Sequence, residues 1–566
     1  MSTLLSLIPK PSSLTSPTAI VLPSSHPPSK TGDEQEEYSY ADLRSLVLSF
    51  RKVLIEQLGV KRGEIVALSM TNTLEFVIAF VGTTVSRAIS APLNSAYTLS
   101  EFQFYLQDTK PALLLIPPLK SNKAAQTALD AAKKENVPVY EMWLDDATIR
   151  TNHVFGTRRT DNPTVEQIGD PSPEDIALVL HTSGTTGRPK SVPLAHRNLM
   201  RTTANIIQTY DLSTRDRTYL VMPLFHVHGM LCAFLAPLAA GSSITLPRGG
   251  KFSASVFWHD FVSTRCNWYT AVPTIHSILL NAVKSGKGDE AGPFSPGFKG
   301  TKPKIRFIRS CSSSLAPSTL HALEETFKAP VLEAYAMTEA AHQMTSNIAG
   351  KRFPGTVGVP VGTQISIRSL EDGAPLPPGA IGEVCVRGEN VFNGYWANEK
   401  ANAESFWQAT EGEERASSDD FKGRRWFRTG DQGLLLKEGE GKGNLKLTGR
   451  IKELINRGGE KISPLEVDSA LLSVKEVKEA VCFGVEDPKY GEIVWAGVVL
   501  HGSRQGSKEQ EAKIKKALDG KIAKFKIPER IIFAQSIPKT ATGKIQRRFV
   551  RDAFVKQARQ EKGAKM

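Results

Sequence analysis

Short apolar runs alternate with helix-length segments along most of this chain. Ile65–Leu68, Leu113–Ile116 and Ile176–Leu180 each contain four or five consecutive apolar residues, which is typical of a strand buried on both faces. Leu74–Val85 lies between two of these strands and is long enough for a helix. The alternation predicts further strands and helices at Tyr219–Met222, Ser243–Leu246, Ile305–Ile308 and Val331–Ala334, and near residues 123–134, 229–240, 273–284 and 317–327. We therefore expect an α/β fold with largely parallel sheets.

The pattern changes towards both ends of the chain. Residues 1–37 are rich in Ser, Pro and Thr and are expected to form a flexible extension. Residues 38–449 are predicted to form a large N-terminal domain, with a small β subdomain of short strands and Gly/Pro turns at about 355–387. Residues 450–566 are predicted to form a small α+β domain, with strands and helices at Ala480–Val485, Ile493–Leu500, 507–518 and 544–558.

Composition narrows the class of protein. A chain of 566 residues, 40% hydrophobic and 23% charged, is typical of a globular protein with roughly two to four domains. No apolar run approaches the ~18 residues of a membrane span, so none is expected. The five cysteines are scattered without a Cys-x-x-Cys pair, which favours a reducing compartment and argues against a zinc site.

The net charge of +13 indicates an anionic partner or a solvated basic face. Nucleic acid is the first partner that such a charge suggests. However, no aromatic-rich RNA-binding signature accompanies the basic residues, and small anionic substrates explain the charge equally well. Nucleic-acid binding therefore stays an alternative that rests on charge alone, and no nucleic acid is expected as a partner.

The densest group of polar residues is Thr182-Ser-Gly-Thr-Thr-Gly-Arg-Pro-Lys190, directly after the predicted strand Ile176–Leu180. A glycine-rich turn that leaves a strand lets backbone N–H groups close on an anion, while hydroxyl and cationic side chains add donors. The turn is therefore predicted to bind a polyphosphate through Thr182, Ser183, Gly184, Thr185, Thr186, Gly187 and Lys190. A polar surface loop and a Walker-type P-loop are the alternatives. The Walker spacing fails, because Gly184 and Gly187 are three residues apart and Pro189 precedes the lysine.

Six further polar segments follow in chain order: Pro223-Leu-Phe-His-Val-His-Gly229, Ser310-Cys-Ser-Ser-Ser-Leu-Ala-Pro317, Glu333-Ala-Tyr-Ala-Met-Thr-Glu339, Trp426-Phe-Arg-Thr-Gly-Asp431, the stretch from Gly449 to Ser463, and Pro538-Lys-Thr-Ala-Thr-Gly-Lys-Ile545. Glu339 offers Mg²⁺ a hard oxygen ligand, and Asp431 can accept hydrogen bonds from two ribose hydroxyls. Lys544 can bring charge to a phosphate. Each segment alone also fits a structural role, such as a helix start, a turn or a solvated lysine.

Together and in this order, the segments resemble the adenylate-forming enzymes, the superfamily of acyl- and aryl-CoA synthetases, luciferases and peptide-synthetase adenylation domains. The resemblance covers about residues 40–555. This chain departs from the usual pattern at Ser191, where Gly usually follows the lysine, and at Ser312 and Ser313, where glycines are more usual in the loop that frames adenine.

The resemblance implies a role for each segment. Tyr335 would stack on adenine, Thr338 would contact phosphate, Glu339 would bind Mg²⁺, and Lys544 would act on the α-phosphate. The implied nucleotide-binding residues, besides the phosphate loop, are Ser312, Ser313, Ser314, Glu333, Ala334, Tyr335, Thr338, Asp431, Arg450 and Lys544. Lys452 would be the hinge of a mobile C-terminal domain, and CoA would lie against Gly458, Gly459 and Glu460.

The family's reaction has two half-reactions. ATP and Mg²⁺ convert a small carboxylic acid to an acyl-adenylate with release of pyrophosphate, and a thiol such as that of coenzyme A then displaces AMP. The implied catalytic residues are Lys544, Thr338, Glu339 and His226. A luciferase-like oxygenase and a carrier-protein-loading adenylation enzyme share most of these motifs and remain alternatives.

Three segments look especially like the peroxisomal oxalate–CoA ligases of fungi and plants: the loop from Ser310, the stretch Glu333–Met344 and the stretch Ile455–Pro464. His226, Ser310 and His342 are polar groups near the expected acyl site, and a second carboxylate needs such donors whereas a fatty-acid tunnel favours apolar walls. Oxalate is therefore the expected substrate, with a short- or medium-chain or aryl acid as the alternative.

The sequence ends in Ala564-Lys565-Met566, which resembles a variant of the Ser-Lys-Leu peroxisomal address. The expected location is therefore the peroxisome, reached through an import receptor, and otherwise the cytoplasm.

Overall fold

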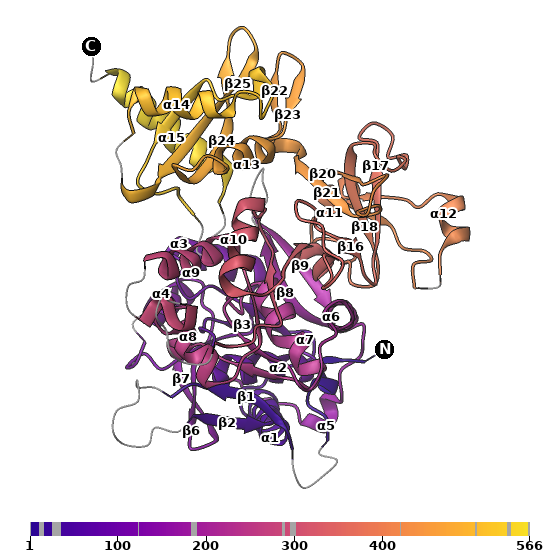
Figure 1. Cartoon of the computed structure of the whole chain (residues 1–566). Coiled ribbons are helices and arrows are strands. Elements are labelled where there is room, and N and C mark those ends of the chain that lie inside the picture. The colour runs from indigo at the N-terminus through magenta and orange to yellow at the C-terminus, as the bar shows by residue number, and fades with distance from the viewer. Residues whose placement is uncertain are drawn as a thin grey trace.

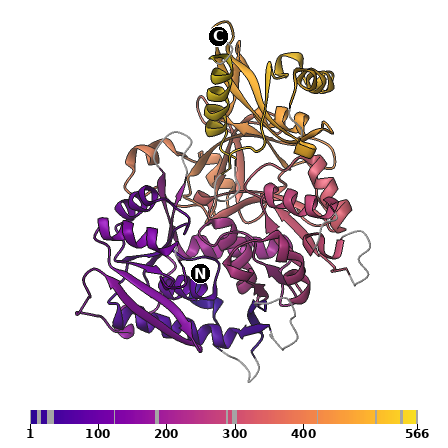
Figure 2. The ribbon, with the colours of Figure 1, turned by 90° about the vertical axis from the view of Figure 1, so that its left-hand side faces the viewer.

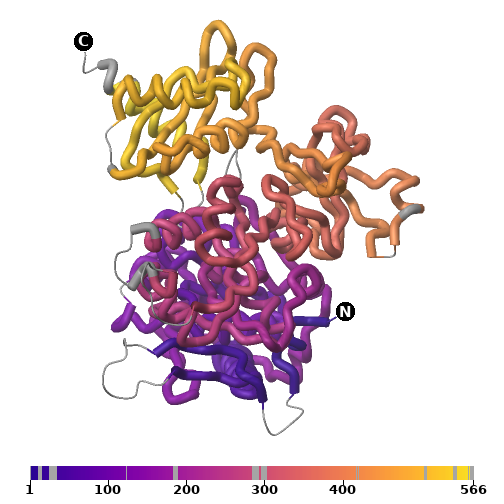
Figure 3. The backbone as a smooth tube through the Cα atoms, viewed as in Figure 1, coloured from indigo at the N-terminus to yellow at the C-terminus, as the bar shows by residue number. Residues whose placement is uncertain are grey.

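The computed structural model describes residues 2–10, 16–24, 35–122, 124–182, 189–285, 289–294, 302–418, 420–503, 506–539 and 545–563. Figure 1 shows three parts: a large body, a small β unit beside it, and a C-terminal unit above both. The C-terminal unit also stands apart after a quarter turn in Figure 2, and the three parts can be followed along the chain trace in Figure 3. The mixed α/β architecture with parallel-rich sheets confirms the predicted fold class.

One sheet of the large body has seven strands within the described residues. Its order is β7 (Thr148–Phe155), β6 (Val139–Asp145), β5 (Leu113–Ile116), β3 (Ile65–Leu68), β4 (Ile89–Pro92), β8 (Ile176–Thr182) and β9 (Lys190–Ala195). The central pairs are parallel and the two outer pairs antiparallel. The short central strands are buried along their whole length, as expected for parallel strands covered on both faces.

The second sheet of the large body has nine strands within the described residues. Its order is β16 (Val359–Pro360), β15 (His342–Ser346), β14 (Val331–Met337), β13 (Phe307–Ser310), β12 (Trp268–Ala271), β10 (Arg217–Tyr219), β11 (Ser243–Thr245), β1 (Thr18–Leu22) and β2 (Glu36–Ser39). The strands from β14 to β1 pair in parallel. Ligands bind at the carboxyl ends of such strands. The Ser310 loop follows β13 at this edge, and the turn that contains Glu339 follows β14.

The helices of the large body lie around and between the two sheets. They are α1 (Tyr40–Lys52), α2 (Leu74–Val85), α3 (Leu99–Thr109), α4 (Ala125–Lys134), α5 (Val165–Ile168), α6 (His196–Tyr210), α7 (Ala236–Ala239), α8 (Ala254–Ser263), α9 (Pro273–Ser285) and α10 (Pro317–Phe327), with the π-type turns η3 (His228–Leu235). Both α2 and η3 are buried almost all round, and Phe80 of α2 meets Phe234 of η3 edge-on with ring centres 6.1 Å apart. One apolar core therefore joins both sheets.

The described parts of residues 1–37 correct the expectation of a flexible extension. Strand β1 pairs with β11, with Ile20 opposite Ile244, and β2 pairs with β1. Leu4 and Leu7 of the short helical turn η1 (Leu4–Leu7) are also buried in the main core. The Ser- and Pro-rich composition misled the prediction, because the partners of these few apolar residues lie about 200 positions away in the sequence.

The small β unit is an antiparallel sheet of β17 (Gln364–Arg368), β18 (Gly382–Arg387), β19 (Phe406–Trp407), β20 (Trp426–Leu435) and β21 (Leu445–Arg450). It carries the short helices α11 (Glu399–Glu404) and α12 (Glu411–Ala416). Strand β20 presents Asp431 and strand β21 presents Arg450, so this sheet supplies two of the predicted nucleotide ligands.

The C-terminal unit has its own sheet and core. Its strands are β22 (Ile455–Arg457), β23 (Glu460–Ile462), β24 (Val477–Asp487), β25 (Gly491–Leu500) and β26 (Arg530–Phe533), and its helices are α13 (Pro464–Leu472), α14 (Lys508–Leu518) and α15 (Arg547–Gly563). The last helix begins at Arg547, three residues after the position expected from the sequence. The boundaries of the predicted domains, 38–449 and 450–566, stay predictions.

Candidate functional site

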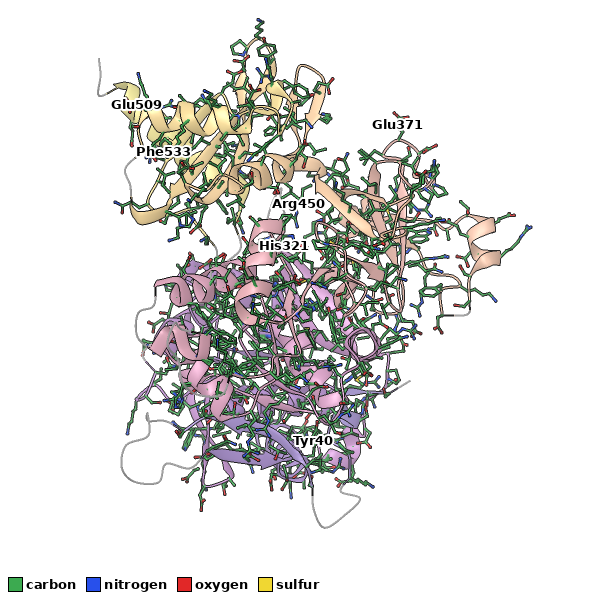
Figure 4. All side chains as sticks on the ribbon, viewed as in Figure 1. Tyr40, His321, Glu371, Arg450, Glu509 and Phe533 are labelled. Atoms are coloured by element: carbon green, nitrogen blue, oxygen red, sulfur yellow. The ribbon has the colours of Figure 1, made fainter. Side chains whose placement is uncertain are left out.

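A cleft of about 1730 Å³ lies between the C-terminal unit and the rest of the molecule. Figure 4 shows Arg450 near this junction. Ten residues that the sequence assigned to the site are in its lining: Ser310, Ser312, Ser313, Ser314, Glu333, Ala334, Tyr335, Asp431, Arg450 and Lys452. Residues of β13, β14 and β20 therefore converge on one space, although Asp431 of β20 is about a hundred residues further along the chain than the other two strands.

Tyr335, Asp431 and Arg450 form one connected group at this cleft. Asp431 and Arg450 are opposite each other in the pairing of β20 with β21, and Arg450 Nε lies 3.3 Å from Asp431 Oδ1. The Tyr335 hydroxyl donates to Asp431 Oδ2 over 2.5 Å. Burial and the adjacent carboxylate raise the pKa of Tyr335 well above its usual value, so the phenol remains a donor. The residues predicted to contact adenine and ribose are thus direct neighbours.

Glu339, Tyr395 and Lys190 form a second group. Glu339 lies in η6 (Thr338–Ala340), is buried, and accepts a 2.9 Å hydrogen bond from the Tyr395 hydroxyl. The Lys190 ammonium lies 4.5 Å from the centre of the Tyr395 ring. Burial raises the pKa of Glu339, although the Tyr395 hydroxyl and the charges of Arg450 and Lys190 act against this rise. The structure therefore brings the predicted Mg²⁺ ligand close to the lysine of the phosphate loop.

The phosphate loop connects the ends of a hairpin formed by β8 and β9. Thr182 and Lys190 are paired across this hairpin. Ser183, Gly184, Thr185, Thr186 and Gly187 lie outside the described residues. At the base of the hairpin, His181 Nε2 lies 2.8 Å from Asp108 Oδ2 of α3 and 3.0 Å from Ser191 Oγ, and Ser191 Oγ also donates to Asp108. Ser191, the departure from the usual glycine, therefore links the loop to helix α3.

A cluster of histidines lies beside the cleft. The rings of His228 and His342 stack with centres 5.2 Å apart, and His226 Nδ1 accepts a 3.1 Å hydrogen bond from the His228 backbone. His228 Nδ1 lies 3.1 Å from Ser312 Oγ, which connects the cluster to the cleft. Burial, with the charge of Arg309, lowers the pKa of His228 and of His342 well below the usual range, so both rings are neutral near pH 7.

Two polar side chains of this region have no hydrogen-bond partner among the described residues. They are His342, at both ring nitrogens, and Ser310, at Oγ, and both side chains are buried. His342 also has a φ of 94° and Ser312 a φ of 72°, which is the left-handed region that favours glycine. The φ of Ser312 explains why a glycine is more usual at that position, and the serine keeps a hydroxyl there at a cost in backbone strain.

Strand β14 also carries a buried carboxylate at the cleft. Glu333 lines the cleft at β14, and its Oε2 accepts a 3.4 Å hydrogen bond from Gly355 N. Burial raises the pKa of Glu333 to about 7. Glu333 is therefore only partly ionised at neutral pH.

The residues predicted to bind CoA are not brought into the cleft lining. Gly458 and Gly459 form the turn between β22 and β23 with φ values of 59° and 92°, which explains the two glycines, and Glu460 begins β23. All three are exposed. Lys452, the predicted hinge, lies in η7 (Ile451–Glu453) directly after β21 and lines the cleft. Lys544 and Ala564-Lys565-Met566 lie outside the described residues.

Comparison with known families agrees with this geometry. Residues 17–396 match the AMP-binding enzyme family, and residues 466–544 match the AMP-binding enzyme C-terminal domain. The chain belongs to the AMP-binding enzymes. The match begins at residue 17, ahead of strand β1, so the family's fold includes part of the stretch expected to be a flexible extension. The predicted membership of the adenylate-forming superfamily is confirmed.

Individual AMP-binding enzymes are similar over nearly the whole chain. The oxalate–CoA ligase of Saccharomyces cerevisiae is 43% identical over 546 residues, which cover 92% of this chain and 94% of the yeast protein. The oxalate–CoA ligase of Arabidopsis thaliana is 44% identical over 520 residues, covering 91% and 93%. The crystal structure of ATP-bound MatB from Rhodopseudomonas palustris aligns with a TM-score of 0.77 at 26% identity and covers 98% of both chains.

Mg²⁺ is commonly held by one or two carboxylates together with substrate phosphates. Among the described residues, no three His, Cys, Asp or Glu side chains gather into a group that could hold a metal ion. The buried carboxylate of Glu339, close to Lys190 of the phosphate loop, fits the donor set that an ATP-bound Mg²⁺ requires. No helix in the described ranges is long and apolar enough to cross a membrane.

Sequence reasoning missed three residues of this AMP-binding site. Tyr395 contacts Glu339 and Lys190, His228 contacts Ser312, and Arg309 lies behind His228. His228 is the second histidine of a segment in which only His226 was singled out, so its position could have been noted. Tyr395 and Arg309 gave no signal, because their partners are distant in sequence.

Proposed function

We propose that this AMP-binding enzyme is an ATP-dependent oxalate–CoA ligase. One carboxylate of oxalate attacks the α-phosphate of ATP, which forms oxalyl-AMP and releases pyrophosphate. The thiol of CoA then attacks the activated carbonyl, so that oxalyl-CoA forms and AMP leaves. The two oxalate–CoA ligases that are 43% and 44% identical over more than nine-tenths of the chain support this reaction class and this acid.

The observation that carries the choice of oxalate is the set of buried polar atoms without partners. A buried donor or acceptor left unsatisfied costs about 1–3 kcal/mol, so proteins rarely keep one without a reason. Both nitrogens of His342 and the hydroxyl of Ser310 are in this condition, and Ser310 lines the cleft. A short acid with a second carboxylate would satisfy such donors, whereas a fatty acyl chain would leave them unpaired.

The nucleotide side supports the adenylation step. In our proposal, Asp431 accepts hydrogen bonds from the ribose hydroxyls, and Tyr335 packs on adenine beside the serines after Ser310. Thr338 and Lys190 contact the phosphates, and Glu339 holds Mg²⁺, which neutralises phosphate charge when it is bound. These groups are positioned by strand ends, so the charge that develops on the α-phosphate meets preorganised partners.

The second half-reaction needs a different set of residues. We propose that residues 450–566 rotate about Lys452 and exchange the face that carries Lys544 for the face that carries Gly458, Gly459 and Glu460. The location of Lys452, between the last strand of the β unit and the first strand of the C-terminal unit, supports its role as the hinge. The role of Lys544 at the α-phosphate rests on the sequence.

The test is CoA-thioester formation with ATP and Mg²⁺ across oxalate, malonate, acetate, hexanoate, octanoate and a cinnamate. We expect a clear preference for oxalate. His342→Ala should then reduce turnover of oxalate more than that of acetate, by about tenfold if one hydrogen bond to a charged group is lost. Preference for hexanoate or octanoate would overturn the choice of acid. Pyrophosphate release without any thioester would point to another acceptor, as in a carrier-loading enzyme or an oxygenase.

We also propose that Ala564-Lys565-Met566 is read by a peroxisomal import receptor where it forms the free C-terminus. The test is the location of a fluorescent protein fused ahead of residues 547–566. Peroxisomal fluorescence that is lost when Lys565→Glu is introduced would support the proposal, and diffuse fluorescence of the unaltered fusion would contradict it.

A further inference from the structure

Arg309 is a fully buried arginine behind His228 and next to Ser310, at the part of the cleft where we place the acid, called here the acyl pocket. It lies on β13, one residue before Ser310, and is 0% exposed. Its Nε donates to the Tyr210 hydroxyl over 2.6 Å, and its Nη2 donates to Gln343 Oε1 over 3.2 Å. Its Nη1 lies 3.3 Å from Thr270 Oγ1 and 3.4 Å from His228 Nε2. All four partners are uncharged.

The charge of Arg309 is therefore uncompensated. Within the ranges that the structure describes, no Asp or Glu forms an ion pair with this guanidinium, although the buried arginines Arg51, Arg368 and Arg387 each have such a partner. Arginine stays charged in proteins, and a buried cation without a counter-charge is costly. An anion that enters the neighbouring pocket would supply the missing negative charge. The positive potential of Arg309 thus favours a pocket occupant with more negative charge.

Arg309 also determines which nitrogen of His228 carries the hydrogen. A guanidinium has donors only, so His228 Nε2, which faces Arg309 and Thr270, is an acceptor. The hydrogen of the neutral ring is then on Nδ1, which donates to Ser312 Oγ over 3.1 Å. Ser312 is left with its own O–H to donate into the cleft that it lines.

We propose that Arg309 is the positioning residue that gives this pocket its preference for a dianionic acid: it supplies an uncompensated positive charge and holds His228 so that Ser312 donates towards the substrate. The inference rests on the proposed oxalate–CoA ligase function and specifies how that site distinguishes two negative charges from one. His342, stacked on His228, shares the same field, and both of its buried ring nitrogens are without a partner among the described residues.

The test uses oxamate, which has the shape of oxalate but one carboxamide in place of a carboxylate and therefore one negative charge. The quantity to measure is the ratio of the inhibition constant of oxamate to the KM of oxalate in pyrophosphate release. Gln343→Glu would place a carboxylate of nearly the same shape 3.2 Å from Arg309 and neutralise it without removing the arginine. We expect this ratio to fall about tenfold in Gln343→Glu.

Gln343→Met is the matched control, because it removes the same hydrogen bond and leaves Arg309 uncompensated. We expect the ratio in this variant to stay within about twofold of that of the unaltered protein. Arg309→Lys, which keeps the charge but not the geometry, should keep the ratio and raise both constants together, since Ser312 is no longer oriented.

The outcomes separate the two proposals. An equal change of the ratio in Gln343→Glu and Gln343→Met, or no change in Gln343→Glu, would overturn the role of Arg309 while oxalate turnover by the unaltered protein still supports the function. If the unaltered protein releases no pyrophosphate with oxalate, the proposed function fails and this inference fails with it.

Discussion

The nucleotide side and the acyl side of this site are built in opposite ways. On the nucleotide side, charged and polar groups are already paired: Asp431 with Tyr335 and Arg450, and Glu339 with Tyr395. On the acyl side, His342 and Ser310 have no described partner. Ser310 and His342 of the acyl side and Tyr335 of the nucleotide side lie on adjacent strands of the nine-stranded sheet. The fold alone therefore does not account for the difference.

The difference follows from what each side must bind. ATP is large and highly charged, and its ligands are kept in place by one another until the nucleotide replaces or joins those bonds. A two-carbon diacid offers few contacts, so its pocket must be dry and its donors unoccupied for each contact to count. The acyl side therefore gives up folding stability for recognition, as functional sites often do.

The strongest test of the paired side is Glu339→Gln. Its carboxylate is the proposed Mg²⁺ ligand, and loss of such electrostatic stabilisation costs about 100- to 1000-fold in rate. We expect adenylation, measured as pyrophosphate release over a range of Mg²⁺ concentrations, to fall by this amount. Tyr395→Phe is the control, because it removes only the hydrogen bond to Glu339, and should cost about tenfold. Similar losses in both variants would show that the carboxylate has no metal-binding role.

Glu333 sharpens the comparison, because it is a carboxylate of the nucleotide side without a cation partner among the described residues. Its pKa is raised by burial to about 7, so the protonated form is favoured in the folded state. The stability that this group contributes is full below about pH 4.5 and is lost as the pH rises through 7. Glu333→Gln should therefore be about 3 kcal/mol more stable than the unaltered protein at pH 8.5 and nearly equal at pH 4.5.

Urea unfolding at these two pH values measures the effect of Glu333→Gln. Asp431→Asn provides the contrast, since Asp431 pairs with Arg450 and loss of this ion pair should destabilise the protein. A constant difference between Glu333→Gln and the unaltered protein at both pH values would mean that Glu333 does not titrate in this range.

The sequence was sufficient for the parts of the fold that local patterns determine. The apolar runs at β3, β5 and β8 have the predicted burial, and the helix α10 has the predicted bounds, because strand and helix periodicity act over a few residues. Strands β14 and β20 then fix where Tyr335 and Asp431 lie. Their convergence on one cleft could be expected from the family resemblance.

Three features could not be predicted because they depend on distant partners. β1 is a strand only through its pairing with β11. Tyr395 meets Glu339 across 56 positions of the chain. Arg309 differs from other buried arginines because it has no described carboxylate partner, and the absence of a contact cannot be recognised from a sequence. The departure from glycine at Ser312 indicated an unusual backbone conformation, but it did not indicate which one the residue adopts.

The unpaired side can be tested by making it more stable. Ser310→Ala removes a buried hydroxyl that has no described partner, so we expect the folded state to gain about 1 kcal/mol while turnover of oxalate falls. Ser346→Ala is the matched control, because Ser346 Oγ lies 2.7 Å from the Tyr210 hydroxyl and donates to Asn347 O. This second variant should lose about 1 kcal/mol. Denaturant midpoints measure both, and loss of stability in Ser310→Ala would show that its hydroxyl is already satisfied.

The smallest effect is expected behind the phosphate loop, where Ser191 stands at a position that is usually glycine. Its hydroxyl joins Asp108 and His181, so the pairing of the nucleotide side extends from the loop to helix α3. Ser191→Gly restores the usual residue and removes the hydroxyl from this group, while His181 and Asp108 remain in contact with each other. We expect the KM for ATP to rise about threefold, as one hydrogen bond at a half-buried site is lost, with the KM for oxalate unchanged. Asp108→Asn, which keeps the shape and weakens the same links, should act alike. If the KM for ATP and the KM for oxalate rose together, the contacts of Ser191 would stabilise the whole domain rather than the phosphate loop. The division between a paired nucleotide side and an unpaired acyl side would then not extend to Ser191.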